Sequence, residues 1–317
     1  MKVGYFLSCE EYGPQELVEQ AVLAERAGFT GLWISDHYHP WNDAQGQSPF
    51  VWSMIGAISQ ACSLPVTTAV TCPTVRLHPA LVAQAAATSA AMLEGRFILG
   101  VGSGEALNEH ILGDPWPHAA RRLEMLEEAV EVIRALWTGE VVSHEGEHYS
   151  VDTARLYTLP DQAPAIYVSA FGPKALEVAA RIGDGFITTK PDGEALTEFR
   201  RLKGDRSAPA MAGFKVAYAE TADEALGHAH RLWANSGLPG ELAQVLPSPQ
   251  HFEQASTLVT KESTGESVVC GNDVQEHRAA FEPFADAGFD EVYVANMGPH
   301  WREMIEFYGA EVLPALS

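Results

Sequence analysis

Short apolar runs recur along the chain, and each is followed by a longer stretch in which apolar residues have helical spacing. The runs that we predict as strands are Lys2 to Leu7, Gly31 to Ser35, Val66 to Val70, Phe97 to Val101, Ala165 to Ser169, Gly185 to Thr188, Phe214 to Ala219 and Glu291 to Ala295. The stretches that we predict as helices are Pro14 to Ala27, Pro49 to Ala61 with Ser48 as its cap, Pro79 to Leu93, Ala119 to Trp137, Pro173 to Ile182, Gly193 to Leu202, Ala222 to Ala234 and a last one from Pro299. Apolar strands that alternate with amphipathic helices are typical of a parallel sheet covered on both faces.

The same joint between a helix and the next strand occurs three times. It ends the helix with a glycine that is followed at once by a strand, and these glycines are Gly28, Gly183 and Gly288. Glycine ends a helix in the left-handed conformation without steric cost, so we expect a positive φ at these positions. Eight alternations of strand and helix predict an α/β fold, a (β/α)8 TIM barrel, in preference to an open sheet.

Two segments are longer than a barrel connection requires. Val141 to Leu159 alternates polar and apolar residues, which predicts a hairpin. Asn235 to Ser267 is partly helical, and we expect it to cover the active site and to influence the choice of substrate. Because no low-complexity linker divides the sequence, we predict a single TIM-barrel domain over residues 1–317, with insertions at about 139–162 and 235–267.

The charge balance limits the partners of the protein. Its 317 residues include 42 acidic and 20 basic side chains, a net charge of −22 that repels phosphodiester backbones and anionic lipid. No run approaches the roughly 18 apolar residues of a membrane span, and Glu10 and Glu11 come too early for a secretory signal. The four cysteines are scattered without CxxC pairs, which favours reduced thiols. We therefore expect a cytoplasmic protein with a small-molecule substrate, and neither nucleic acid nor membrane as partner.

Candidate chemistry gathers where the predicted strands end. In a barrel, the residues after the carboxyl ends of the strands converge on one mouth. At these positions stand Ser8, Cys9, Glu10, Glu11, Asp36, His37, Tyr38, His39, Trp41, Thr71, Cys72, Gly102, Ser103, Gly104, Glu105, Asn108, Ala170, Phe171, Gly172, Thr188, Thr189, Lys190 and Asn296. Most of these residues are polar or small, so we expect the mouth to hold the active site.

The segment DHYHPW carries the most specific pattern of this set. A histidine can exchange a proton near neutral pH, a neighbouring carboxylate increases its basicity, and a tryptophan excludes water. We therefore expect His37 to act in proton transfer, although a histidine that only fixes a loop is the alternative. A metal held by His37 and His39 is a weaker hypothesis, because the spacing supplies no third ligand, and we expect no metal.

The segment GVGSGEALNE does not fit a dinucleotide fingerprint, because Glu105 and Leu107 stand where GxGxxG requires glycine. Its glycines instead allow the backbone to approach a flat ring, with Glu105 as proton donor or acceptor. A glycine turn with a solvated glutamate is the alternative. Gly172 and Pro173 begin a helix whose free N–H groups favour phosphate, or they serve only as its cap.

The motifs ISDHYHPW, TAVTCPT, FILGVGSGEALNE, YVSAFGP and DGFITT, in this order, resemble the luciferase-like flavin and deazaflavin oxidoreductases. SDHYHPW and GSGEALNE resemble in particular the branch that contains the F420-dependent glucose-6-phosphate dehydrogenases. The resemblance covers nearly the whole chain and implies a dehydrogenase that uses the deazaflavin coenzyme F420. It also implies an actinobacterial source and a homodimer.

The resemblance implies roles for individual residues. His37 matches the base that takes a proton from the substrate hydroxyl while hydride passes to C5 of the deazaflavin. Glu105 matches the acid that supplies a proton to the pyrimidine end of the ring, and Trp41 matches the aromatic residue that shields the developing charge. The implied cofactor contacts are Asp36, Ala69, Val70 with a cis peptide before it, Cys72, Asn108, Ser169, Ala170, Phe171, Gly172 and Thr189, and the implied substrate contacts are Glu10 and Lys190.

The sequence departs from the sugar-phosphate members of the family at the residues that hold the phosphate. Lys190 lies near one of their three basic residues, but Gln254 and Glu266 stand at our matches to the other two, and Cys72 replaces a usual hydroxyl residue. A carboxylate binds an anion poorly, so we expect a sugar or secondary alcohol other than glucose 6-phosphate. The alternatives are a reductase that uses reduced F420 on an enone or imine, an FMN-dependent monooxygenase, and a noncatalytic cofactor-binding protein.

Overall fold

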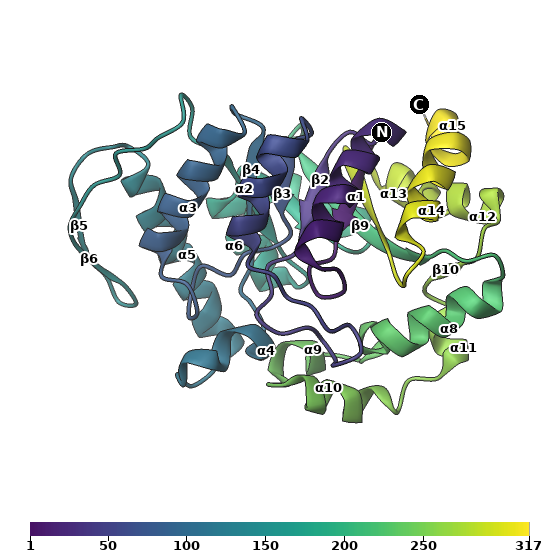
Figure 1. Cartoon of the computed structure of the whole chain (residues 1–317). Coiled ribbons are helices and arrows are strands. Elements are labelled where there is room, and N and C mark those ends of the chain that lie inside the picture. The colour runs from purple at the N-terminus through teal and green to yellow at the C-terminus, as the bar shows by residue number, and fades with distance from the viewer. Residues whose placement is uncertain (317) are drawn as a thin grey trace.

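Parallel strands close into a barrel in the computed structural model, which describes residues 1–316 (Figure 1). Around the barrel the strands follow the order β9-β11-β1-β2-β3-β4-β7-β8, and β8 pairs with β9 to close it. Their bounds are β1 (Lys2–Leu7), β2 (Leu32–Ile34), β3 (Val66–Thr68), β4 (Phe97–Val101), β7 (Ala165–Ser169), β8 (Gly185–Thr188), β9 (Ala210–Ala217) and β11 (Glu291–Asn296). The predicted (β/α)8 barrel is therefore confirmed.

Helices form the outer layer of the barrel. They are α1 (Pro14–Ala27), α2 (Val51–Ala61), α3 (Pro79–Met92), α5 (Ala119–Leu136), α6 (Pro173–Ile182), α7 (Gly193–Lys203), α8 (Ala222–Trp233), α12 (Val274–Ala279), α13 (Glu282–Ala287) and α14 (Trp301–Phe307), which continues through a π-helical turn (Tyr308–Val312) into α15 (Leu313–Leu316). Their apolar faces cover the outward side of the strands in one buried cluster. Each strand is therefore buried on both faces, as its continuous apolar sequence predicts.

Aromatic side chains fill the interior of the barrel, and glycines make room for them. The rings of Trp33 and Tyr293 are stacked with centroids 4.6 Å apart. A Cβ on Gly4 would lie 2.2 Å from the Tyr293 ring, and one on Gly213 would lie 2.5 Å from Trp33. Large side chains from some strands are thus matched by the absence of a side chain on their neighbours.

The structure corrects three local predictions. The strand predicted from Phe214 begins at Ala210, and Met211 and Gly213 of its first part face the interior of the barrel, where Gly213 leaves room for Trp33. Gly28 and Gly288 have φ of 98° and 86°, but Gly183 has φ −85°. Gly183 is needed for space instead, since a Cβ there would lie 2.8 Å from the Ala179 carbonyl oxygen.

The predicted Ser48 cap is also wrong. Helix α2 begins at Val51 after an N-cap residue, Phe50, that makes no side-chain cap. Ser48 donates its hydroxyl to the His37 carbonyl oxygen at 2.8 Å instead. It therefore fixes the loop that carries the predicted base.

The two long segments form additional structure. The hairpin is confirmed as β5 (Val142–Glu145) and β6 (Ser150–Ala154), which pair antiparallel. The later segment contains a 3-10 helix (Ala234–Gly237), α9 (Leu242–Val245), α10 (Pro249–Ser256) and α11 (Lys261–Gly265), followed by β10 (Val269–Cys270), which extends the sheet at β9. In Figure 1, α8 to α11 lie together on the side of the barrel away from both termini.

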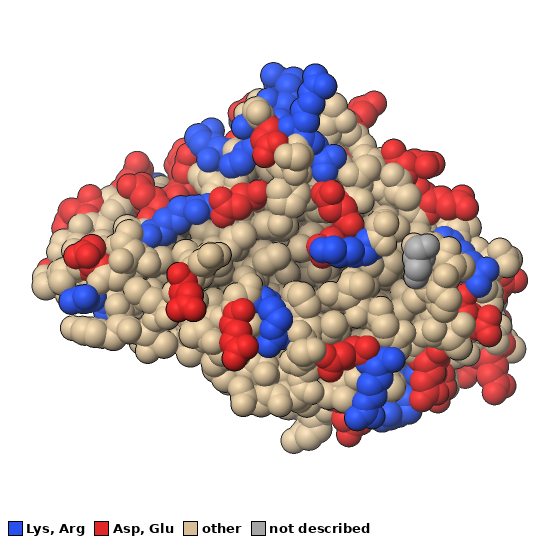
Figure 2. Space-filling model, turned by 90° about the horizontal axis from the view of Figure 1, so that it is seen from above, with Lys and Arg blue, Asp and Glu red and all other residues tan. Residues whose placement is uncertain are grey.

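The face that carries the termini shows how the charges are distributed (Figure 2). Acidic and basic side chains are interspersed around this face, with uncharged surface between them. Within residues 1–316, no helix is both long and apolar enough to cross a membrane.

The close packing of the barrel interior leads to a prediction. We expect Gly213→Ala to lower the free energy of unfolding by about 1–3 kcal/mol, because its methyl group would overlap the Trp33 ring. Gly227→Ala is the matched control, since a Cβ there meets nothing closer than 3.9 Å in the middle of α8, and it should be neutral or stabilising. Urea unfolding of both variants tests this, and an unchanged midpoint for Gly213→Ala would contradict it.

Candidate active site

His37 lies on the loop after β2 and is held from both sides of its ring. Its Nδ1 lies 3.0 Å from the His39 carbonyl oxygen and 3.0 Å from the Asn108 amide nitrogen. Its Nε2 lies 3.3 Å from a Glu10 carboxylate oxygen and 3.9 Å from one of Glu105. Three loops, after β1, β2 and β4, therefore meet at this imidazole.

The protonation of His37 decides which of these contacts are hydrogen bonds. Nδ1 donates to the His39 carbonyl when it carries a hydrogen, and it accepts from the Asn108 amide when it does not. In the imidazolium form, Nδ1–H binds the carbonyl and Nε2–H faces the Glu10 carboxylate. Two forms thus have a partner at each ring nitrogen, namely the neutral tautomer with hydrogen on Nε2 and the imidazolium.

Glu10 is buried and ionised. Its side chain is 4% exposed, and its second oxygen accepts a hydrogen bond of 2.6 Å from the Ser35 hydroxyl. Burial raises the pKa of this carboxyl, but the charges of His37 and Lys215 and the Ser35 hydrogen bond more than offset it, so the pKa is lowered overall. Glu10 therefore carries the negative charge that stabilises a protonated His37.

Asn108 connects the loops after β2 and β4. Its side-chain oxygen accepts from the backbone N–H groups of Tyr38 and His39 at 2.8 and 3.0 Å. Its amide nitrogen lies against both His37 Nδ1 and the Glu105 carboxylate. Asn108 therefore holds His37, the predicted base, next to Glu105, the predicted acid. These two side chains lie closer together than the two ends of a tricyclic ring.

Asp36, a predicted cofactor contact, is engaged with the protein itself. One oxygen pairs with the Arg76 guanidinium at 2.8 Å, and the other accepts from the Thr71 hydroxyl at 2.9 Å. Glu109 accepts from the backbone N–H of Arg76 at 2.7 Å and pairs with its Nε at 3.4 Å. The side chains of Asp36, Arg76 and Glu109 are 0%, 6% and 1% exposed, so this is a buried ionic network.

Sequence reasoning missed Arg76 and Glu109. Arg76 lies seven residues beyond the cis peptide of the third loop, and neither residue directly follows a predicted strand. Burial raises the pKa of Glu109 to about 7, although Arg76 opposes this shift. The sequence offers only an arginine four residues after Cys72 and a glutamate at the end of GVGSGEALNE, and neither indicates its partner.

The glycine-rich loop and the third loop lie in close contact. The peptide bond between Ala69 and Val70 is cis, as the resemblance implies. A Cβ on Gly102 would lie 2.7 Å from Val70 Cγ2, and Gly104 has φ 73° with Cys72 Sγ 2.5 Å from the position of its missing Cβ. The glycines are therefore required for these two loops to lie together, and Ala69 and Val70 pack on the aromatic interior of the barrel.

The other predicted residues lie at the same end of the barrel. Trp41 packs edge-on against Phe252 of α10 at 5.0 Å between centroids, so the long segment does cover the loop of His37. Ala170 is buried, Ser169 is half-buried, and Phe171, Gly172, Thr189 and Lys190 are exposed. Gly172 is the N-cap of α6, and a Cβ there would meet nothing within 4 Å.

The prediction named Glu11 at the mouth but missed Lys215 and Trp233, which lie beside it. Lys215 of β9 places its Nζ 3.3 Å from the centroid of the Trp233 ring, and the Trp233 N–H donates to Glu11 at 2.6 Å. Burial raises the pKa of Glu11 to about 7, opposed by hydrogen bonds from Trp233 and Gly298. The sequence offered little signal for Lys215, because it stands inside an apolar run.

The hypothesis of a metal at His37 and His39 finds no third ligand in the structure as described. His39 Nδ1 faces the Leu107 carbonyl oxygen at 2.9 Å, and the two histidines are joined through a backbone carbonyl. The groups of possible metal ligands within residues 1–316 lie elsewhere, at Glu224, His228 and His300 and at Glu124, Glu147 and His148.

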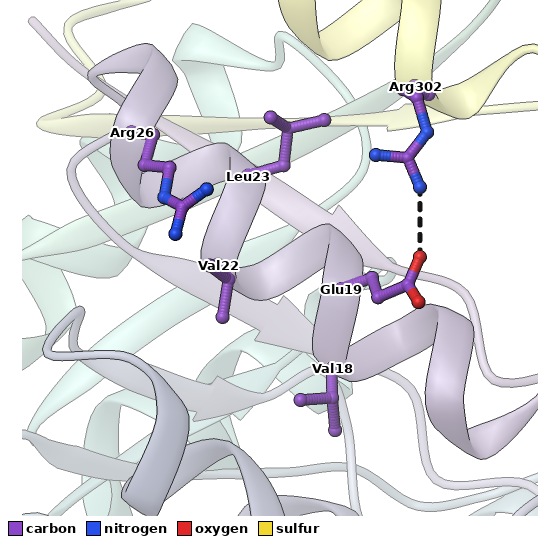
Figure 3. A pocket seen from close by; sticks show the side chains of 6 residues that line it. All are labelled: Val18, Glu19, Val22, Leu23, Arg26 and Arg302. Carbon is purple, nitrogen blue, oxygen red and sulfur yellow. Dashed lines mark hydrogen bonds and ion pairs between the residues drawn. The ribbon is translucent and has the colours of Figure 1, made fainter.

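The outer surface of the barrel has a shallow hollow between α1 and α14, shown in Figure 3. It is lined by Val18, Glu19, Val22, Leu23, Arg26 and Arg302, and an ion pair of 2.9 Å joins Glu19 to Arg302 across it. A second hollow lies between α5 and α6. Neither hollow contains a residue of the barrel mouth. The polar residues at the mouth therefore remain the candidate site.

Comparisons with known proteins show which family the chain resembles. The family model of luciferase-like monooxygenases matches residues 1–291. An F420-dependent glucose-6-phosphate dehydrogenase of Microbacterium testaceum is 36% identical over 329 residues, which cover 100% of this chain and 97% of that protein. A protein of the same description from Mycobacterium avium is 33% identical and covers 100% and 98%.

Solved structures give the same result. An F420-dependent secondary alcohol dehydrogenase in complex with an F420-acetone adduct is 31% identical, has a TM-score of 0.92, and covers 100% of this chain and 99% of its own. The F420-dependent tetrahydromethanopterin reductase of Methanopyrus kandleri has a TM-score of 0.79 at 20% identity and shares the fold. The resemblance seen in the motifs is therefore confirmed over the full length.

The buried ionic network leads to a prediction about stability. Arg76→Leu would leave the buried carboxylates of Asp36 and Glu109 without a cation, and we expect it to lower the free energy of unfolding by about 3–5 kcal/mol. Arg76→Lys keeps the charge without the guanidinium fork and should lie in between.

The control is Arg201→Leu, which removes an exposed ion pair with Glu198 and should barely change stability. Urea unfolding of the three variants provides the measurement. Equal midpoints for Arg76→Leu and Arg201→Leu would show that the network does not support the mouth.

Proposed function

The chain belongs to the luciferase-like monooxygenase family, and we propose that within it this protein is an F420-dependent dehydrogenase that oxidises a sugar or secondary alcohol. The observation that carries the proposal is the imidazole of His37 between the carboxylates of Glu10 and Glu105. The relatives described as F420-dependent dehydrogenases support the choice of cofactor and of reaction class. Bound F420 would supply a ring carbon, C5, that accepts hydride from the substrate or returns it.

The residues of the mouth fit a flat ring with a phosphate-bearing side chain. Gly102 and Gly104 let the backbones of the loops after β4 and β3 lie together at the mouth, because a Cβ on either glycine would collide with Val70 or Cys72. The first N–H groups of α6, after Gly172, form a helix N-terminus that favours phosphate. We assign the ring contacts to the loops after β3 and β4, and the phosphate contacts to Gly172 and Thr189.

His37 acts as the base in this proposal. It takes the proton of the substrate hydroxyl, and the ionised Glu10 stabilises the imidazolium that results. The His39 carbonyl and the Asn108 amide hold the ring in position in either protonation state.

Glu105 and Trp41 complete the set. Glu105, which accepts a hydrogen bond from the Asn108 amide, supplies the proton to the cofactor or takes it back. Trp41 is held between His37, at 5.0 Å between centroids, and Phe252. It therefore excludes water from the imidazole and shields charge that develops there.

The substrate is uncharged at the end where sugar-phosphate enzymes bind phosphate. Gln254 and Glu266 are exposed, and neither carries a positive charge. Lys190, which is also exposed, is the one basic residue of these three positions. With a net charge of −22, an anion would need a local cluster of cations to be held. We therefore propose a neutral substrate in place of glucose 6-phosphate.

A titration of the protein with F420 and with FMN tests the proposal. We expect F420 to bind at least about 100-fold more tightly than FMN, and a neutral sugar or secondary alcohol to bleach the absorbance of oxidised F420. Glucose 6-phosphate should be a poor substrate. Tight FMN binding without F420 binding would favour a monooxygenase, and consumption of reduced F420 by an enone without any alcohol oxidation would favour a reductase.

The role of Glu10 gives a second prediction. Glu10→Gln keeps the volume and an acceptor for Ser35, but it removes the charge beside His37, so kcat for alcohol oxidation should fall about 100-fold. The dissociation constant of F420 should stay within about threefold. Glu19→Gln on the outer face is the control and should retain full activity. An unchanged kcat in Glu10→Gln would exclude this electrostatic role.

A further inference from the structure

Lys215 points into the barrel at its mouth. Side chains alternate along β9, and Met211 belongs to the interior cluster while the missing side chain of Gly213 would meet Trp33. Lys215 is the next inward position toward the carboxyl end of the strand. Its register partner on β11 is Ala295, a small member of the same interior cluster, so there is room for the long side chain.

The ammonium group of Lys215 lacks a hydrogen-bond acceptor. Among the described residues, no oxygen lies within hydrogen-bonding distance of its Nζ and no carboxylate within 4.0 Å. Its contact is the face of Trp233, 3.3 Å from the ring centroid. An ammonium carries three N–H donors, and those of this half-buried lysine are not bound within the described protein, so they are available to water or to a ligand. The cation–π contact holds the ammonium in place over the Trp233 ring.

Carboxylates lie just beyond the reach of this ammonium. The Trp233 ring that supports Lys215 on its face binds the Glu11 carboxylate at its N–H edge at 2.6 Å. Burial lowers the pKa of Lys215 to about 8, and the charges of Glu10 and Glu11 oppose this shift, so both carboxylates are close enough to act on it. The ammonium and the carboxylates are thus near one another without direct contact.

A hydroxyl group fits between such partners. It accepts a hydrogen bond from the ammonium at about 2.9 Å and donates one to a carboxylate at about 2.6 Å, and so bridges groups that are too far apart to pair directly. An anionic group fits less well, because it would face the ionised Glu10. A donor-only residue beside an acceptor-only residue is suited to groups that are both donor and acceptor, as the hydroxyls of a polyol are.

We propose that Lys215, Trp233 and Glu11 form a binding site for a second hydroxyl group of the substrate, and that the substrate is a neutral polyol or sugar. This inference rests on the proposed function, since it places the hydroxyl beside the one that is oxidised. It also explains why a lysine stands inside an otherwise apolar strand. Lys215 is a specificity residue here, whereas His37 performs the proton transfer.

Matched substrates test the proposal. The rate of F420 reduction is measured with cyclohexanol and with trans-cyclohexane-1,2-diol, which differ by one hydroxyl. We expect the wild-type kcat/KM to be at least about 10-fold higher for the diol. Lys215→Met should lower it about 10- to 100-fold for the diol and less than about threefold for cyclohexanol. Lys2→Met, at the opposite end of the barrel, should change neither value.

A second variant and a binding measurement keep the outcome clear. Trp233→Phe keeps a ring beneath the ammonium but loses the N–H to Glu11, and it should reduce the preference for the diol without abolishing activity. Calorimetric titration of both compounds into the protein measures the affinity for each. It therefore shows a preference for the diol over cyclohexanol even if neither compound is oxidised. Failure of F420 binding or of all oxidation would therefore refute the proposed function alone.

Two results would overturn the inference. One is equal affinity and equal kcat/KM of the wild-type protein for the diol and cyclohexanol, which would mean that only water lies between Lys215 and the carboxylates. The other is the same loss on both compounds in Lys215→Met, which would assign the lysine a general electrostatic role in the mouth.

Discussion

The ion pairs of Arg76 with Asp36 and Glu109 hold the mouth of the barrel in one arrangement. They join the loops that follow β2, β3 and β4, and all three side chains are almost fully buried. A buried charge that loses its partner costs several kcal/mol, so these loops cannot separate cheaply. His37 and Asn108 stand on two of the loops that this network joins, and their contact is therefore fixed by residues that take no part in proton transfer.

Carboxylates of the mouth lie close to side chains that can carry a positive charge. Glu10 faces His37, and Glu11 lies near Lys215 across the Trp233 ring. In each case an acceptor-only carboxylate lies near a group that can carry a positive charge. Such an arrangement suits the hydroxyl recognition and the proton transfer proposed above better than it suits a phosphate, because each positive charge has a carboxylate nearby. The chemistry of the mouth thus agrees with the departures seen at Gln254 and Glu266.

Most of the fold was predictable because buried parallel strands and amphipathic helices have distinct local patterns. The prediction failed where a distant side chain decided the outcome. The first part of β9 was missed because the fit of Gly213 depends on Trp33, which comes from another strand. Ser48 caps no helix, because its hydroxyl is taken by the loop of His37.

The sequence by itself determined the order of strands and helices, and it determined which residues follow the strand ends, because both depend on neighbours along the chain. His37, Glu105 and Asn108 could be chosen on that basis. Only the tertiary structure decided that Glu10 lies against His37, that Arg76 pairs with two carboxylates, and that Lys215 faces Trp233 without an acceptor. The physical reason is closure of the barrel, which joins residues far apart in the chain, and no local pattern records such contacts.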